Sequence, residues 1–222
     1  MDRRELARRI EHTLLAPDAR ADDVRRLCDE AREWGVHAVC VAPARVALAA
    51  RRLGSCGVGV VSVAGFPHGD TLPGVKAAEA AAVLDAGAVE VDMVMAIGVF
   101  KDGDDRAVVA DIAAVAEAVH GAPGRLLKVI LETALLSPDE IARACRLAVD
   151  AGADFVKTST GFARAGASVE AVARMRASVP PQIGVKAAGG IRDYATAMQM
   201  VAAGATRIGA SATRDILRGA PD

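Results

Sequence analysis

Two lysines occupy positions where a protein can make an amine reactive. Lys157 lies in the segment DFVKTSTG and Lys186 in IGVKAAGG, each late in an apolar, strand-like run. The chain has only five lysines beside 22 arginines. Arginine is not deprotonated in proteins, whereas burial readily shifts the pKa of lysine, so lysine is required where a neutral amine is needed. We therefore treat Lys157 and Lys186 as candidates for amine chemistry, and Lys76 and Lys101 as ordinary exposed residues.

Carboxylates accompany the two lysines. In the segment VEVDMVM, Glu90 and Asp92 fall on one face of a strand. Val91 and Met93 fall on the other face, and if that apolar face packs on helices, both carboxylates point into a barrel. Asp92 is nearer the end of the strand and is the stronger functional candidate. A buried ion-pair network is the alternative, but two lysines and one aspartate leave surplus positive charge, which is more typical of an active site.

Lys157 and Lys186 are expected on neighbouring strands and therefore close in space, and two neighbouring lysines can make one amine neutral near pH 7. A free lysine has a pKa of about 10.4, and lowering it to about 7 requires roughly 4 to 5 kcal/mol. A second ammonium group about 4 to 5 Å away supplies roughly 3 to 4 kcal/mol at an effective dielectric constant near 20, and desolvation supplies the remainder. Asp92 would oppose this shift if it faced Lys157, so we expect it nearer Lys186 or nearer a substrate. Lys128 and Glu132 share one face of LLKVILE and are expected to form an interior pair with a structural role.

Small-residue loops follow three of the strand-like segments. Glycines allow backbone N–H groups to approach an oxyanion, and barrel enzymes often hold phosphate after strands 7 and 8. Each loop alone could be an ordinary turn, but three of them beside two lysines indicate a phosphorylated ligand. The candidate substrate- and phosphate-binding residues are Thr160 and Gly161 after Lys157, Gly189 and Gly190 after Lys186, and Gly209 and Ser211 at the last strand.

Helix boundaries recur in a regular way along the chain. Gly35, Gly87, Gly152 and Gly204 are predicted to end helices before β-branched runs. The segment SPDE predicts a helix start, with Ser137 as N-cap and Glu140 closing a capping box. The positions of that helix predicted to face inward are Ile141, Ala144, Cys145 and Ala148.

Eight strands are predicted between these helices, at residues 12–15, 36–41, 58–64, 89–95, 126–132, 154–159, 183–188 and 206–210. Strands that alternate with helices over this length predict an α/β fold, a TIM (β/α)8 barrel, as a single domain over residues 1–222. An open doubly wound sheet is the alternative, but neither G-x-G-x-x-G nor a Walker A motif occurs.

Composition narrows the class of ligand and the compartment. The formal net charge is −1 and 52% of residues are hydrophobic. Without a long basic run there is no electrostatic footprint for nucleic acid or for a membrane surface, so small ligands are expected. The four cysteines are scattered without a C-x-x-C pair, so neither a zinc site nor a disulfide framework is indicated. The segment after Met1 is charged and no uncharged run of about 18 residues occurs, so we expect a cytoplasmic protein.

Taken together, these segments resemble the deoxyribose-phosphate aldolase family. The resemblance covers residues 8 to 217 and rests on IEHTLLAPDA, VCVAP, GFPHG, VKAAEA, EVDMVMAIG, LKVILET, ADFVKTSTGF, VKAAGGIR and RIGAS. VKTSTGF and VKAAGGIR are highly specific, whereas the small-residue loops occur in other phosphate-binding barrels. Ala42, His68 and Ala96 stand where the family commonly has other residues. These differences bear on substrate preference and leave the three candidate catalytic positions intact.

The resemblance implies a class I aldolase on a TIM barrel, active in nucleoside degradation. It implies that Lys157 forms a Schiff base, that Lys186 lowers the pKa of Lys157, and that Asp92 joins the proton relay. The implied reaction is reversible cleavage of 2-deoxy-D-ribose 5-phosphate to D-glyceraldehyde 3-phosphate and acetaldehyde. It needs no metal and no organic cofactor, because the protonated imine serves as electron sink.

The expected partners are therefore a phosphorylated sugar and an aldehyde, and the expected assembly is a homodimer. A sugar-phosphate isomerase and a catalytically silent phosphate-binding barrel are the alternatives. The paired strand lysines argue against the isomerase, and the intact set of Asp92, Lys157 and Lys186 argues against the silent barrel.

Overall fold

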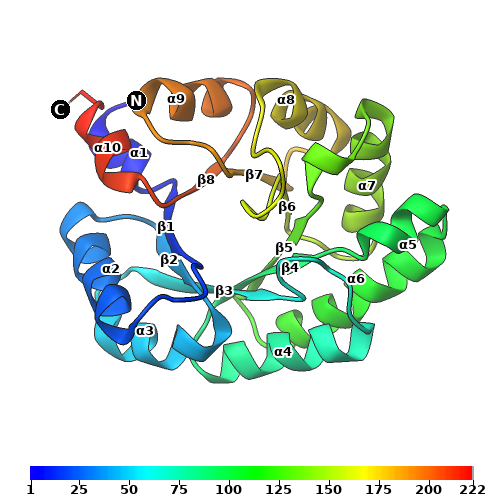
Figure 1. Ribbon diagram of the computed structural model, residues 1–222, viewed down its shortest axis with the longest axis horizontal. Coiled ribbons are helices and arrows are strands. Elements are labelled where there is room, and N and C mark those ends of the chain that lie inside the picture. The colour runs from blue at the N-terminus through cyan, green and yellow to red at the C-terminus, as the bar shows by residue number, and fades with distance from the viewer. Residues whose placement is uncertain (222) are drawn as a thin grey trace.

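The fold is a closed barrel of eight parallel strands surrounded by helices (Figure 1). The computed structural model describes residues 1–221. The strands are β1 (Ile10–Leu14), β2 (Ala38–Val41), β3 (Gly59–Ala64), β4 (Glu90–Val94), β5 (Leu126–Ile130), β6 (Phe155–Lys157), β7 (Gly184–Ala188) and β8 (Arg207–Ala210). Strand order follows chain order, and β8 pairs with β1 to close the barrel. The predicted (β/α)8 barrel is confirmed and the open-sheet alternative is wrong, because closure leaves no free edge.

Helices lie outside the strands all around the barrel (Figure 1). They are α1 (Arg3–Ala7), α2 (Ala21–Trp34), α3 (Val46–Leu53), α4 (Pro73–Asp85), α5 (Ile97–Asp102), α6 (Asp105–His120), α7 (Pro138–Asp150), α8 (Val169–Ser178), α9 (Tyr194–Ala202) and α10 (Thr213–Arg218). Short 3-10 turns follow β2 (Pro43–Arg45) and β5 (Thr133–Leu135). The two ends of the chain meet where α1 contacts α10, which brings the N-terminal and C-terminal segments to the same side of the barrel.

Local sequence signals explain where helices begin and end. At α7 the Ser137 side chain accepts a hydrogen bond from the backbone N–H of Glu140, and Glu140 caps in return, as predicted. The four predicted inward positions of α7 are its buried residues. Gly35 ends α2 in the left-handed conformation, at a φ of 63°. Gly87, Gly152 and Gly204 follow one residue after the caps of α4, α7 and α9, also with positive φ.

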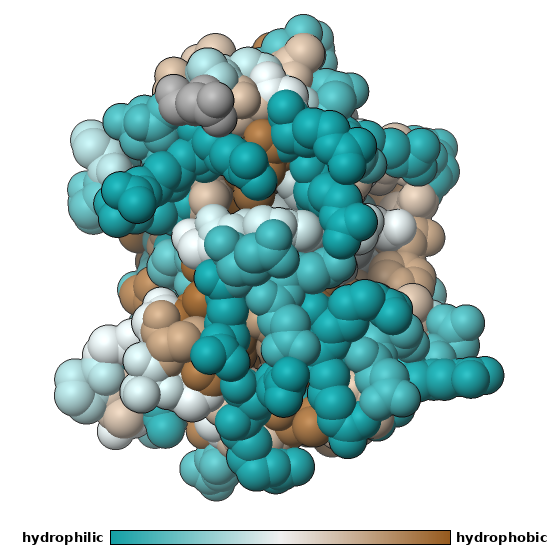
Figure 2. Space-filling model, turned by 90° about the vertical axis from the view of Figure 1, so that its left-hand side faces the viewer, coloured by the Kyte–Doolittle hydropathy of each residue, from teal (hydrophilic) through white to brown (hydrophobic). Residues whose placement is uncertain are grey.

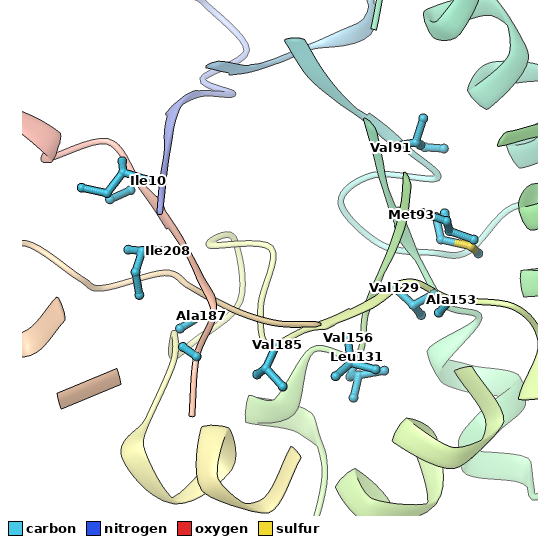
Figure 3. Packing of buried hydrophobic residues seen from close by; sticks show 14 of the residues in the cluster. Ile10, Val91, Met93, Val129, Leu131, Ala153, Val156, Val185, Ala187 and Ile208 are labelled. Atoms are coloured by element: carbon cyan, nitrogen blue, oxygen red, sulfur yellow. The ribbon is translucent and has the colours of Figure 1, made fainter. Parts of the chain in front are cut away.

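The alternation of side chains along the strands separates an apolar outer layer from a mixed interior. Figure 3 shows Val91 and Met93 pointing away from the barrel towards the helices, where they are fully buried. Glu90 and Asp92, which alternate with them along β4, therefore point inward. Inside the barrel, a small apolar cluster lines β2 and β3 (Ala38, Cys40, Val61 and Val63). The charged interior groups come from the remaining strands.

The expectation that Lys76 is exposed is wrong. Lys76 lies on α4, is fully buried, and its Nζ donates hydrogen bonds to Asp111 Oδ2 at 2.7 Å and to the backbone oxygen of Val94 at 3.0 Å. Local sequence could not indicate this contact, because the partner lies on α6, 35 residues away. Lys101 is exposed as expected and pairs with Glu140 at the surface.

The side of the molecule that carries both ends of the chain is mostly hydrophilic, with only separate apolar spots (Figure 2). No helix within residues 1–221 combines the length and the apolar character needed to cross a membrane.

Candidate active site

A lysine–aspartate centre lies inside the barrel. Lys157 on β6 and Lys186 on β7 are directly paired in register, which confirms that they are neighbours. The Nζ of Lys157 donates a hydrogen bond to Asp92 Oδ2 at 2.7 Å, and the Nζ of Lys186 donates to the same oxygen at 2.6 Å. All three residues are buried, and Lys157 is the most exposed of them, with 3% of its surface accessible to solvent. Asp92 was expected nearer Lys186 or nearer a substrate, but it contacts both amines almost equally, because the pairing of β6 with β7 brings them to one oxygen.

Lys128 on β5 contacts the other side of Asp92. Its Nζ donates a hydrogen bond to Asp92 Oδ1 at 2.9 Å and lies 2.5 Å from Glu90 Oε2. The interior positions of Glu90 and Lys128 agree with the alternation read from sequence. The predicted pair of Lys128 with Glu132 does not form, because Glu132 follows the end of β5 and its side chain turns to Thr160 instead.

Two charged members of the cluster were missed from the sequence. Glu11 on β1 forms an ion pair with Lys186. On β8, the Nη1 atom of Arg207 lies 3.1 Å from Glu11 Oε1 and 3.3 Å from Glu90 Oε2. Glu11 was missed because the first strand was predicted to begin at residue 12, whereas β1 begins at Ile10. Arg207 was missed because a single charge in a short strand more often indicates solvent exposure.

The cluster carries more positive than negative groups. It holds four cationic side chains (Lys128, Lys157, Lys186 and Arg207) and three carboxylates (Glu11, Glu90 and Asp92). Burying an unbalanced charge is costly. The balance is restored if one lysine is neutral.

Lys157 is the lysine whose electrostatic surroundings favour the neutral amine. Burial lowers the pKa of Lys157, and the nearby Lys186 ammonium lowers it further, against an opposing effect of Asp92. Burial also acts to lower the pKa of Lys186, but the carboxylates of Asp92 and Glu11 outweigh it and leave that pKa raised. Lys186 therefore stays charged while Lys157 more readily loses its proton.

Asp92 is held as a carboxylate by the same cluster. Burial acts to raise its pKa, but the charges of Lys128, Lys157 and Lys186 outweigh burial and hold the pKa well below its usual range. Burial acts in the opposite direction on Lys128 and lowers its pKa, but the carboxylates around this lysine outweigh burial and raise its pKa overall. Asp92 can therefore accept hydrogen bonds from all three lysine amines and orient the amine of Lys157.

One group of possible metal ligands occurs within residues 1–221, formed by Glu11, Cys40 and Asp92 with ligand atoms within 4.8 Å of one another. Both carboxylates already accept hydrogen bonds from lysines. Burial raises the pKa of the Cys40 thiol to about 11, which disfavours the thiolate form that binds metals. This donor set fits an amine centre better than a divalent cation, which would have to displace the lysines.

The loops predicted to bind phosphate follow the carboxyl ends of β6, β7 and β8. Gly161, Gly189 and Gly190 all have positive φ, which a glycine adopts without a steric penalty. A Cβ added to Gly189 would lie 3.6 Å from the Cα of Gly161, so the loops after β6 and β7 are in contact. Ser211 is exposed at the start of the loop after β8.

Gly209 differs from the other glycines because it is buried in the barrel wall. A Cβ at this position would lie 3.0 Å from Lys186 Cε and 3.1 Å from the Cβ of Ala188. The absence of a side chain at Gly209 therefore leaves the room that the stem of Lys186 occupies.

A cavity of about 570 Å³ opens over the carboxyl ends of β3 to β6. Its lining includes Glu132, His68, Asp70 and Phe162. It also includes Thr160, which follows Lys157 by three positions in the sequence. In α/β barrels the groups that act on substrates gather at this end of the strands. The cavity is large enough for a small phosphorylated sugar.

The fold and the centre define a class of protein, a TIM barrel with a buried lysine whose neighbours favour its neutral form. The chain belongs to the DeoC/LacD family of aldolases, whose family model matches residues 1–219. It is 52% identical to the deoxyribose-phosphate aldolase of Thermococcus kodakarensis over 100% of both chains. It is also 52% identical to the enzyme of that name from Aciduliprofundum boonei, over 98% of this chain and 97% of the relative.

A solved structure gives the same result for the fold. The deoxyribose phosphate aldolase of Aeropyrum pernix, described as a unique tetrameric structure, superposes with a TM-score of 0.90 at 36% identity. The match covers 97% of this chain and 91% of the other. The family resemblance read from the motifs is confirmed.

Proposed function

We propose that this protein is a class I aldolase that reversibly cleaves 2-deoxy-D-ribose 5-phosphate to D-glyceraldehyde 3-phosphate and acetaldehyde. The observation that carries the proposal is the buried amine of Lys157, hydrogen-bonded to Asp92 beside the charged Lys186. A neutral lysine is the nucleophile that Schiff-base chemistry requires. The names of the 52% identical relatives support the choice of substrate.

Lys157 begins the reaction by attacking the C1 carbonyl of the open-chain sugar. Loss of water gives a protonated imine between Nζ and C1. The C3 hydroxyl then gives up its proton, the C2–C3 bond breaks, and its electron pair moves into the imine to form an enamine. C3 becomes the aldehyde carbon of glyceraldehyde 3-phosphate, which departs. Protonation of the enamine at C2 and hydrolysis of the imine release acetaldehyde and the free amine.

The neighbouring side chains supply the electrostatics and the proton transfers. The Lys186 ammonium favours neutral Lys157 by charge repulsion, and it is close enough to exchange protons through Asp92. Because Asp92 accepts hydrogen bonds from both amines, it forms the link between them in a proton relay.

The phosphate group would bind to the loops that follow β6, β7 and β8. The residues proposed for the substrate and its phosphate are Thr160, Gly161, Gly189, Gly190, Gly209 and Ser211. The contact between the first two of these loops and the positive φ of Gly161, Gly189 and Gly190 support this assignment.

Reductive trapping tests the proposal directly. The purified protein is incubated with 2-deoxy-D-ribose 5-phosphate and a metal chelator, reduced with borohydride, and digested for mass spectrometry. We expect a stable adduct on Lys157 and none in a Lys157→Met variant. An adduct on Lys186 or Lys128 would reassign the nucleophile within the same mechanism. Product formation without any adduct would refute the aldolase mechanism and favour a sugar-phosphate isomerase.

We further propose a cytoplasmic homodimer. The tetramer described for the Aeropyrum pernix relative supports self-association in the family, without fixing the number of subunits here. Light scattering after size exclusion should give twice the chain mass of 22.8 kDa. A value of one or four chain masses would contradict the dimer.

A further inference from the structure

Glu132 combines a strained backbone with a buried carboxyl group. It is the one non-glycine residue with positive φ within residues 1–221, at 56°. Apart from glycine, few residues other than Asn and Asp adopt this backbone conformation. It is only 2% exposed. Within residues 1–221, no lysine, arginine or histidine forms an ion pair with Glu132, and its Oε1 has no hydrogen-bond partner among these residues. Each of these features is unfavourable for folding.

The second carboxyl oxygen of Glu132, Oε2, is fully hydrogen-bonded, and the strained backbone conformation makes these bonds possible. Oε2 of Glu132 accepts hydrogen bonds from both the backbone N–H of Thr160, at 3.1 Å, and the Thr160 hydroxyl. The same hydroxyl oxygen accepts a hydrogen bond from the backbone N–H of Phe162 at 3.1 Å. One side chain after β5 therefore fixes the turn formed by residues 160–162, which follows the strand that carries Lys157.

The backbone around Glu132 is itself tied to the Lys157 strand. The N–H of Leu131 donates to the backbone oxygen of Lys157, and the N–H of Thr133 donates to that of Thr158, both at 2.9 Å. These two bonds hold residue 132 between them, and the left-handed conformation turns its side chain towards Thr160. The 160–162 turn also contains Gly161, whose Cα lies close to Gly189 in the next loop.

We propose that Glu132 is a positioning residue that fixes the 160–162 turn to receive the phosphorylated end of the substrate. The inference rests on the proposed function. Loss of the Oε2 contacts would leave Gly161 free to move relative to Gly189, so the N–H groups of the two loops would no longer converge on one anion. Glu132 acts through Thr160, and the chemistry at Lys157 does not require it.

The test compares phosphorylated and unphosphorylated substrates. Glu132→Gly removes the carboxyl group and relieves the positive φ, so the backbone keeps its conformation without strain. We expect the KM for 2-deoxy-D-ribose 5-phosphate to rise roughly tenfold to a hundredfold, the range for losing hydrogen bonds to a charged acceptor. The kcat/KM for 2-deoxy-D-ribose should change less than about threefold, because that substrate has no phosphate to bind.

A conservative variant distinguishes positioning from a general structural role. In Glu132→Gln the amide oxygen can accept both Thr160 hydrogen bonds, so the KM should return to within about threefold of the parent value. Thr160→Val, which leaves residue 132 unchanged, should raise the KM for the phosphorylated substrate in the same direction. Glu117→Gln is the matched control, because Glu117 is exposed on α6.

Three outcomes would overturn the positioning role: equal KM increases for both substrates, no increase in Glu132→Gly, or no rescue by glutamine. The proposed aldolase function is tested separately, by borohydride trapping with acetaldehyde alone. Absence of any lysine adduct in the parent protein overturns the aldolase proposal. An adduct together with an unchanged KM in Glu132→Gly overturns only the role of Glu132.

Discussion

Replacing Lys186 with methionine should raise the pKa of Lys157 and slow imine formation most strongly near neutral pH. Burial and the Lys186 ammonium lower that pKa, and Asp92 opposes them. Both amines bond the same carboxylate oxygen, at 2.7 and 2.6 Å, and such geometry puts two donors roughly 4 to 5 Å apart. Two like charges at that separation repel by about 3 to 4 kcal/mol at an effective dielectric constant near 20. Methionine keeps an unbranched apolar stem beside Gly209 while removing the charge.

The expected loss of rate is on the order of 10² to 10³ near pH 7, since each 1.4 kcal/mol is a factor of about ten. The rate should recover as the pH rises, because the neutral amine then forms without help from Lys186. The assay is single-turnover trapping of acetaldehyde with cyanoborohydride, followed by intact-protein mass spectrometry, from about pH 6 up to about pH 10, near the ordinary pKa of lysine. Lys101→Met, at an exposed lysine, is the control. A rate loss of equal size at every pH would refute the electrostatic reasoning and leave Lys186 with a proton-transfer role alone.

Three further substitutions test how the surroundings support the centre. Lys76→Met should lower the free energy of unfolding by about 3 to 5 kcal/mol, because it leaves the buried Asp111 without its cation. Urea denaturation measures this, and adding Asp111→Leu should recover most of the loss. Gly209→Ala should lower kcat by about tenfold or more, since the new Cβ crowds the Lys186 stem; an unchanged kcat in steady-state assays would contradict that role. The folded-state pKa of Asp92 lies below its unfolded value, so its stabilising contribution is present above about pH 4 and is lost as the pH falls through the folded-state pKa. Asp92→Asn should therefore show a urea midpoint that depends less on pH in acid than that of the parent, and an identical pH dependence would argue against this source of stability.

Several elements of the fold and of the site follow from local sequence. Period-two alternation placed Glu90 and Asp92 inside the barrel, and the helix-glycine-strand pattern located eight strands. Ser137 and Glu140 marked the start of α7 because a capping box depends only on residues three apart. The lysines at the ends of β6 and β7 were recognised as neighbours because consecutive strands of a barrel lie side by side.

Other contacts could not be read from local pattern because their partners are distant in the chain. Lys76 has the appearance of a surface lysine until α4 packs on α6 and places it against Asp111. Glu132 looked like a partner for Lys128 because both lie on one face of the segment. The chain leaves the strand after Ile130, however, and the left-handed conformation of Glu132 directs its side chain to Thr160.

The sequence by itself determined the barrel, because periodicity is a local property that survives in a linear chain. Its motifs carried the resemblance to the family, and that resemblance implies the roles of the three candidate catalytic residues. Only the tertiary structure decided which neighbours lower the pKa of Lys157 and raise that of Lys186, and which carboxylate holds which loop. The pKa values of Asp92 and Lys157 depend on charged side chains from β4, β5, β6 and β7, and Coulomb interactions depend on distances that exist only after the barrel has closed.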